Sequence, residues 1–213
     1  MQLQTQPVEA TLYSLSDALP EPAERRGDNR LMTLFRLGAV VVEDRRELCL
    51  IKNISAGGML IRAYCPIAVG ATLSVELKRG EMIRGSVTWA SDGNLGVTFD
   101  TPVDVIALLA PVPDSLRPRL PRIEVQCTAT VRQGATAFAV RTRDVSQGGL
   151  KVESDRILQV GDEVIVTLPG LAARHGVISW AAAGCFGINF SNMMALAELV
   201  AWLHEQREEM RAA

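Results

Sequence analysis

The sequence repeats itself at a fixed distance of 91 residues, and this repeat constrains the fold more than any other feature. The segment NISAGG occupies residues 53–58, and DVSQGG occupies residues 144–149. Trp89 and Trp180 are separated by the same 91 residues, and each lies ten residues before a phenylalanine. Three landmarks at one offset indicate a duplication. The sequence therefore predicts two copies of one structural unit.

The two copies are expected to be separate domains. A chain of 213 residues suits two domains of about 100 residues each. The segment APVPD at 110–114 is typical of a linker. We expect an N-terminal tail over 1–23, which has prolines and no clear periodicity, a first domain over 24–113 and a second domain over 114–213.

Each copy is predicted to consist mainly of short β-strands. TLSVEL at 72–77 and IEVQCTATV at 123–131 alternate polar and apolar residues, which is typical of a sheet with one solvated face. Several short strands per 90 residues, separated by Gly and Asp turns, favour a closed barrel or a sandwich. The other predicted strands cover 37–42, 47–51, 82–89 and 95–99 in the first copy, and 137–142, 150–153, 163–168, 175–180 and 186–190 in the second.

Helices are predicted only after the strands of each copy. The segment 195–212 places Leu196, Leu199, Val200 and Leu203 on one stripe, as in an amphipathic helix. The shorter segment 102–109 is interpreted as its reduced counterpart after the first copy. Both helices are expected to cover a barrel.

Composition excludes several classes of protein. The net charge is −2, which does not favour a polyanion-binding surface, and no leader or membrane-spanning segment is expected. Four scattered cysteines and two histidines, without a CxxC pair, argue against a metal site. The cysteines are interpreted as small hydrophobic residues of a protein in the reducing cytoplasm.

The repeated motif places polar side chains together on one strand face. Residues i and i+2 of a strand share a face, so Asn53 lies beside Ser55, and Asp144 beside Ser146, while the residue between them points into the core. The glycines that follow permit positive φ and leave backbone that a flat ligand can approach. An ordinary turn explains the motif equally well, because Asn, Asp, Ser and Gly dominate turns.

Arginines ahead of the first motif favour a ligand over a turn. Residues 24–36 hold four arginines and two acidic residues, and Arg26 and Arg30 are separated by three residues. A guanidinium fork binds a phosphate, or the N7/O6 edge of guanine, through two parallel hydrogen bonds. Asn53 or Asp144 could accept hydrogen bonds from the donors on guanine's other edge. The pattern predicts a ligand that contains both guanine and phosphate.

These residues resemble the PilZ domain family, whose signature is RxxxR followed downstream by [D/N]xSxxG. The first copy matches both parts, from Arg26 to Arg30 and from Asn53 through Ser55 to Gly58. The tryptophan and the Gly-x-x-Phe ending at 96–99 also resemble the family. The resemblance covers about residues 24–213 as two tandem domains.

The resemblance implies a mainly β fold of two tandem six-stranded antiparallel barrels, each followed by a helix. It also implies a receptor for the bacterial second messenger cyclic di-GMP, with no other cofactor. Arg26 and Arg30 would fold over the ligand, Asn53 and Ser55 would contact guanine, and Gly58 would keep the barrel surface open. In the family, an arginine directly before the motif, here Arg25, is associated with a stacked dimer of the ligand.

The second copy departs from the family pattern. Asp144, Ser146 and Gly149 match it, but the arginine segment reads RPRLPR, with Arg117, Arg119 and Arg122. If Arg122 is aligned with the second arginine of the RxxxR motif, a proline stands at the position of the first arginine. Proline offers no hydrogen-bond donor. In a regular strand residue 143 would also share a face with the apolar residue 145; a bulge could resolve this conflict, but the sequence does not show one. We therefore expect the main site in the first copy and a possible second site in the second.

Other functions are less consistent with the sequence. No catalytic triad, phosphate loop or dinucleotide fingerprint is present, so an enzyme is not expected. Nucleic-acid-binding barrels stack bases on exposed aromatic residues, whereas Trp89, Trp180, Phe99 and Phe190 lie at core-like strand positions. The serious alternative is a ligand-free PilZ scaffold in motility or polysaccharide export. For the receptor, we expect that ligand binding orders the arginine segment and presents a new surface to a protein effector.

Overall fold

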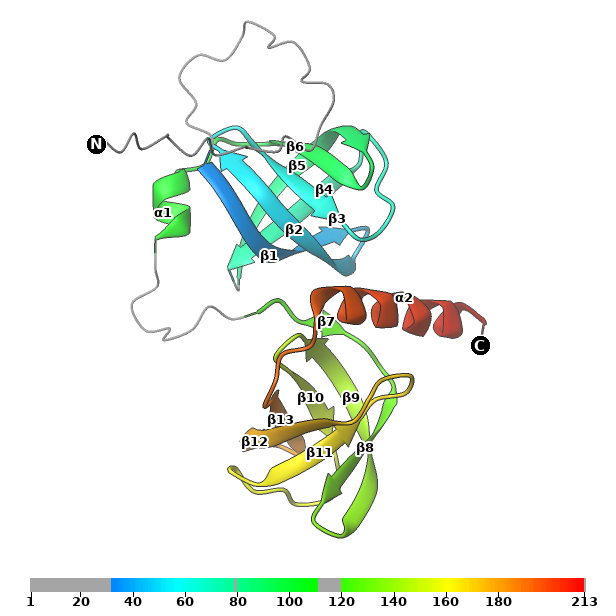
Figure 1. Cartoon of the computed structure of the whole chain (residues 1–213). Coiled ribbons are helices and arrows are strands. Elements are labelled where there is room, and N and C mark those ends of the chain that lie inside the picture. Colours follow the sequence, from blue (N-terminus) through cyan, green and yellow to red (C-terminus); the bar gives the residue numbers. More distant parts are fainter. Residues whose placement is uncertain (1–31, 79, 111–119, 213) are drawn as a thin grey trace, which may run out of the picture.

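Two β-barrels follow one another along the chain in the computed structural model, which describes residues 32–78, 80–110 and 120–212 (Figure 1). The strands of the first barrel are β1 (Met32–Val42), β2 (Arg45–Ser55), β3 (Gly58–Ala63), β4 (Thr72–Lys78), β5 (Glu81–Ser91) and β6 (Asn94–Phe99). Among the described residues they form one closed antiparallel ring in the order β1-β2-β3-β6-β5-β4. The helix α1 (Val105–Leu109) follows.

The second barrel repeats this plan with an additional short strand. Its elements are β7 (Ile123–Glu124), β8 (Thr128–Gln133), β9 (Thr136–Ser146), β10 (Gly149–Glu153), β11 (Glu163–Thr167), β12 (Arg174–Ala182), β13 (Cys185–Phe190) and the helix α2 (Leu196–Ala212). Pairing between β10 and β9 closes six of the described strands into a barrel, and β7 pairs with the outer edge of β9. The predicted fold class of two six-stranded antiparallel barrels, each followed by a helix, is confirmed.

The alternating segments form strands for the predicted reason. Leu73, Val75 and Leu77 of β4 point into the first core, and the polar residues between them point outward. The segment 123–131 is split between β7 and β8, although its alternate residues still face the second core. The strand β3 was not among the predicted strands. The linker prediction over 110–114 falls mostly outside the described residues.

Each barrel contains the same backbone hydrogen bond, made by residues that are 91 positions apart in the sequence. The N–H of Phe99 donates to the carbonyl of Gly57 at 2.9 Å, and the N–H of Phe190 donates to Gly148 at 2.9 Å. Both phenylalanines are buried, as predicted. The repeat therefore encodes the same connections in three dimensions, not only similar letters.

The prediction that Trp89 and Trp180 lie in the core is wrong. Their side chains are 46% and 38% exposed. A register shift one residue before each tryptophan turns the indole to the outer surface. Each indole covers a glycine of the neighbouring strand: a Cβ on Gly96 or Gly187 would lie 2.0 Å from the indole nitrogen.

The helix α2 lies between the two barrels (Figure 1). Leu199, Trp202 and Leu203 bury one side of the helix in the core of the second barrel. The Trp202 indole donates a hydrogen bond to the carbonyl of Pro169 at 2.7 Å. The predicted apolar stripe is thus present, and Trp202 is an additional member that the sequence reading left out.

The other side of α2 and the adjoining strands contact the first barrel. Arg207 forms an ion pair with Glu47 of β2. His204 Nε2 lies 2.6 Å from the carbonyl oxygen of Tyr64. Leu48 of β2 is buried within the hydrophobic cluster of the second barrel, with Leu37 packed beside it. These contacts fix how the outer faces of the two barrels meet.

Replacing Trp202 with alanine should destabilise the second barrel by about 3–5 kcal/mol, because the change removes a fully buried side chain and leaves a cavity. Chemical denaturation of the full chain measures this loss. Ala201→Ser, at an exposed neighbouring position, should change stability by less than about 0.5 kcal/mol. A loss below about 1 kcal/mol for Trp202→Ala would contradict the role assigned to α2.

Candidate functional site

Each repeated motif lies at the end of a strand that contains one extra residue. Lys52 is inserted before Asn53 in β2, and Arg143 is inserted before Asp144 in β9, while their neighbours pair with successive residues of the next strand. Such a bulge shifts the alternation by one position. Val145 is fully buried as a result, so the predicted conflict with residue 143 is resolved by the bulge that the sequence did not reveal.

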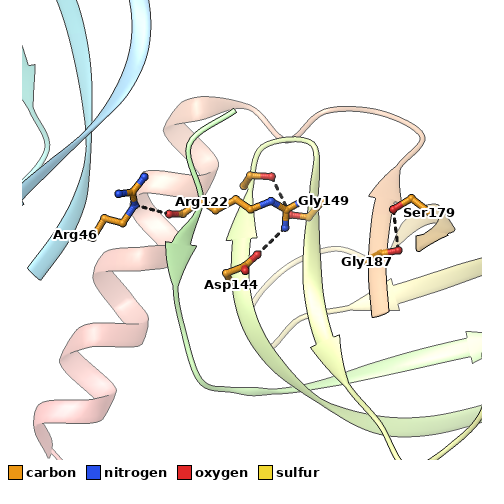
Figure 2. A network of polar contacts seen from close by, with 7 residues as sticks. Arg46, Arg122, Asp144, Gly149, Ser179 and Gly187 are labelled. Atoms are coloured by element: carbon orange, nitrogen blue, oxygen red, sulfur yellow. Dashed lines mark hydrogen bonds and ion pairs between the residues drawn. The ribbon is translucent and has the colours of Figure 1, made fainter. Parts of the chain in front are cut away.

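The motif serines make the same hydrogen bond in both barrels. Ser55 Oγ donates to the carbonyl of Gly58 at 3.1 Å, and Ser146 Oγ donates to the carbonyl of Gly149 at 3.1 Å (Figure 2). Each hydroxyl therefore closes the turn between two strands and retains lone pairs that can accept a further hydrogen bond.

The last glycine of each motif is required by the neighbouring strand. A Cβ on Gly58 would lie 2.5 Å from the carbonyl oxygen of Val97, and a Cβ on Gly149 would lie 2.1 Å from that of Ile188. Positive φ does not explain Gly58, which does not adopt it. A side chain is excluded at these glycines because the neighbouring strand approaches too closely. The openness of this surface to a ligand stays a prediction.

In the first copy, the motif side chains lie on the outer surface of the barrel end. Asn53 is half-buried, and its Oδ1 accepts a hydrogen bond from the N–H of Leu60 at 3.2 Å. Ile54 points the opposite way into the core, as predicted. The arginines expected to reach this surface, Arg25, Arg26 and Arg30, lie outside the described residues.

In the second copy, an arginine that precedes the barrel contacts the motif carboxylate. Arg122 Nη1 donates to Asp144 Oδ1 at 2.6 Å (Figure 2). The strand β7 explains this geometry, because its two residues pair with Val145 and Asp144 and hold Arg122, which directly precedes the strand, at the same edge of β9. The structure thus brings Arg122, Asp144, Ser146 and Gly149 together, whereas Arg117 and Arg119 lie outside the described residues.

A cleft of about 930 Å³ lies beside this ion pair, between the two barrels. Its volume falls within the range of small-molecule sites, about 300–1,000 Å³. Its lining combines cationic, anionic, hydroxyl and aromatic groups from both barrels. Those used below are Arg46 and Glu76 of the first barrel, and Arg122, Asp144, Ser146 and Trp180 of the second.

Sequence reasoning missed the contributions of the first barrel to this cleft. Arg46 Nε donates to the carbonyl oxygen of Arg122 at 2.9 Å, and the same guanidinium forms an ion pair with Glu76. Nothing in the sequence around Arg46 signals this contact, because it depends on how the barrels are docked. Trp180 was missed for a different reason, because the register shift that turns its indole to the surface is not visible in the sequence.

The described cysteines and acidic residues do not form a metal centre. Within residues 32–78, 80–110 and 120–212, no three His, Cys, Asp or Glu side chains gather in a group that could hold a metal ion. Burial raises the pKa of the Cys49 thiol to about 12 and that of Cys65 to about 11. Both thiols are therefore kept in the neutral form, which is a poor metal ligand. In the same part of the chain, no helix has the length and apolar character needed to cross a membrane.

Comparison with known proteins identifies one family twice in the chain. The model of the PilZ domain matches the chain twice, over residues 24–110 and 116–205. A comparison with curated protein sequences found no match.

Among solved structures, the PlzA protein of Borreliella burgdorferi in complex with c-di-GMP is similar at 11% identity and a TM-score of 0.34, covering 82% of this chain and 92% of its own. YcgR of Escherichia coli, also in complex with c-di-GMP, has 14% identity and a TM-score of 0.35, with coverages of 84% and 88%. The inhibitor of motility MotI/DgrA of Bacillus subtilis has 12% identity and a TM-score of 0.33, with coverages of 84% and 99%.

The contact at Gly58 gives a direct test of the motif's structural role. Gly58→Ala should destabilise the first barrel by about 1–3 kcal/mol, because the new methyl group collides with a backbone carbonyl that cannot rotate away. The adjacent Gly57→Ala has open space and should stay within about 0.5 kcal/mol of the parent. Thermal or urea unfolding of both variants decides the matter, and equal stability of the two would refute the explanation.

Proposed function

The chain belongs to the PilZ domain family, and on that premise we propose that it is a receptor for cyclic di-GMP that relays ligand binding to a protein effector. The proposal rests on the chemistry of the two motifs. Cyclic di-GMP presents two guanine bases, which carry N–H donors on one edge and the N7 and O6 acceptors on another, and two phosphates. A receptor therefore needs oxygen acceptors and guanidinium donors on adjoining surfaces.

One observation carries the proposal: Arg122 reaches the carboxylate of Asp144 from the segment ahead of the barrel. The family pattern separates these two groups by more than twenty residues of sequence. The fold brings them within 2.6 Å, beside a cleft of suitable size. A guanidinium and a carboxylate side by side can bind the acceptor edge and the donor edge of guanines, or a guanine and a phosphate.

Asp144 can hold Arg122 and a guanine base at the same time. The arginine uses Oδ1, and a carboxylate has about four lone-pair sites on its two oxygens. In the proposed complex, Oδ2 accepts from guanine, and the remaining donors of Arg122 face the ligand. Trp180, on the same wall of the cleft, offers an indole face for stacking, which contributes about 1–3 kcal/mol per base.

Two negative phosphates require more positive charge than the described lining supplies. The charges of the described lining cancel, because its cations and acids are equal in number: Arg46, Arg122 and Lys151 against Glu76, Glu124 and Asp144. We assign the additional charge to Arg117 and Arg119, which precede Arg122 in the segment between the barrels.

The first copy is proposed to hold a site of its own. There Arg26 and Arg30, with Arg25 for a stacked ligand dimer, would close over Asn53 and Ser55, with Gly58 setting the turn. The sequence reading placed the main site here because the arginine motif is complete. Asn53 differs from Asp144 in being neutral, so it offers one oxygen acceptor and two N–H donors to the base.

Signal transfer follows from the position of the cleft. A ligand that contacts walls from both barrels changes the free energy of their docking only if it binds the docked and undocked arrangements differently. A change in docking would alter the surface offered to an effector, which we place, with the receptor, in the cytoplasm. A ligand-free scaffold is the alternative, in which the contact between Arg122 and Asp144 only holds the segment ahead of the barrel in place.

Titration calorimetry of the full chain with cyclic di-GMP separates these functions. We expect saturable binding at micromolar concentration or below. Arg30→Ala should remove binding to the first copy, and Asp144→Ala should weaken binding to the second by about tenfold or more, the value of a charged hydrogen bond of about 1.5–3 kcal/mol. The combined variant should retain only this weakened binding to the second copy.

Matched controls lie on the surface of the second barrel. Asp155→Ala and Arg132→Ala remove one charge of each sign at exposed positions away from the described cleft lining, and both should bind like the parent. Absence of heat and of competition at saturating ligand would reject the receptor and leave the scaffold. Unchanged stoichiometry in Asp144→Ala would assign binding to the first copy alone.

A further inference from the structure

Arg46 of the first barrel is held rigidly at the mouth of the interdomain cleft. Its guanidinium forms an ion pair with Glu76 of β4, a side chain that is only 9% exposed. The other carboxylate oxygen of Glu76 accepts a hydrogen bond from the N–H of Gly80 at 2.8 Å. Because its partner is buried and fixed twice, Arg46 has little freedom to turn away from the second barrel.

Another donor of this guanidinium is directed at the second barrel. Arg46 Nε donates to the carbonyl oxygen of Arg122 at 2.9 Å, across a sequence separation of 76 residues (Figure 2). The side chain of the same Arg122 contacts Asp144. A continuous series of polar contacts therefore runs from Glu76 through Arg46 and Arg122 to the motif carboxylate.

Apart from the buried side chains of Ile123 and Val125, the main chain at Arg122 has few other supports among the described residues. The strand that follows it, β7, is two residues long and pairs only with β9. The N–H of Val125 adds one bond, to the carbonyl of Arg143 at 3.2 Å. A segment this short depends on outside contacts for its position, and Arg46 supplies one from the opposite barrel.

We infer that Arg46 is a positioning residue for the ligand site of the second copy: it fixes the backbone of Arg122 so that the Arg122 guanidinium faces both Asp144 and the cleft. This inference rests on the proposed function of that site. It adds a residue of the first barrel, outside both family motifs, to the determinants of affinity in the second. The first barrel then influences ligand affinity through one hydrogen bond as well as through its shape.

A purely mechanical role in holding the barrels together is a different explanation, and the structure offers a variant that separates the two. Arg207 of α2 forms an ion pair with Glu47 of the first barrel, and among the described residues no hydrogen bond or ion pair links it to Arg122 or Asp144. If docking alone matters, loss of Arg207 should weaken ligand binding as much as loss of Arg46. If positioning of Arg122 matters, only the Arg46 change should do so.

The test uses the full chain carrying Arg30→Ala, so that cyclic di-GMP titrates the second site alone. Arg46→Ala and Arg46→Lys should each weaken binding by about three- to tenfold, the effect of one hydrogen bond. Lysine keeps the charge but lacks the Nε donor beside the fork, so it should not rescue. Arg45→Ala, at the exposed neighbouring position, and Arg207→Ala should stay within about twofold of the parent.

A double-mutant cycle tests whether Arg46 affects ligand binding through the Arg122 side chain. Arg122→Ala retains the carbonyl that Arg46 contacts but removes the guanidinium that is positioned. The effect of Arg46→Ala should therefore disappear in the Arg122→Ala background, whereas independent effects would add. Additive effects, or equal losses for Arg46→Ala and Arg207→Ala, would overturn the inference.

A second readout does not depend on the ligand. Amide hydrogen exchange at residues 123–125 should accelerate in Arg46→Ala and stay unchanged in Arg45→Ala, because the segment loses its support from the first barrel. Unchanged exchange would contradict the positioning role even if the ligand fails to bind. Absence of binding in the parent, with accelerated exchange in Arg46→Ala, would reject the proposed function of the site and retain the structural part of the inference.

Discussion

A single inserted residue in the second strand of each barrel determines where the polar motif points. Side chains of a strand in a closed barrel alternate between the core and the surface. If the alternation of the residues before the motif simply continued, Val145 would point to the surface and Asp144 into the core. The insertions at Lys52 and Arg143 reset the alternation. The strand then ends with an apolar residue inside, two polar residues outside and a glycine turn that packs against the next strand. The candidate sites in both copies depend on this reset.

The two copies have diverged in what surrounds this common surface. In the second copy, α2 is long enough to pack on its own barrel and to contact the first through Arg207 and His204. In the first copy, α1 is a five-residue helix without a buried residue. The motif surface of the second barrel therefore faces a wall built by another barrel, and a cleft results. Duplication supplied two similar surfaces, and docking changed the environment of one of them.

Most of the fold could be predicted because it follows from local patterns. The two-residue alternation of 72–77 and the apolar stripe of 195–212 each depend on neighbouring residues alone, and the 91-residue repeat is visible by direct comparison of the two halves of the sequence. The bulges could not be predicted, because an inserted residue is visible only once the partner strand is placed. Separate bulges in β5 and β12 explain the error at Trp89 and Trp180, whose positions suggested the core. The hydrogen bond from Arg46 to Arg122 was equally hidden, since it joins residues 76 positions apart through the docking of two domains.

The central claim is that cyclic di-GMP binds in the interdomain cleft against the guanidinium of Arg122. Two-dimensional NMR of the full chain with ¹⁵N-labelled arginine observes the side-chain Nε–H groups directly, and substitution of Arg122 and Arg46 assigns their signals. The account predicts that both signals shift saturably as the messenger is added, with the same dissociation constant. Signals of both arginines that stay in place at saturating ligand would contradict it.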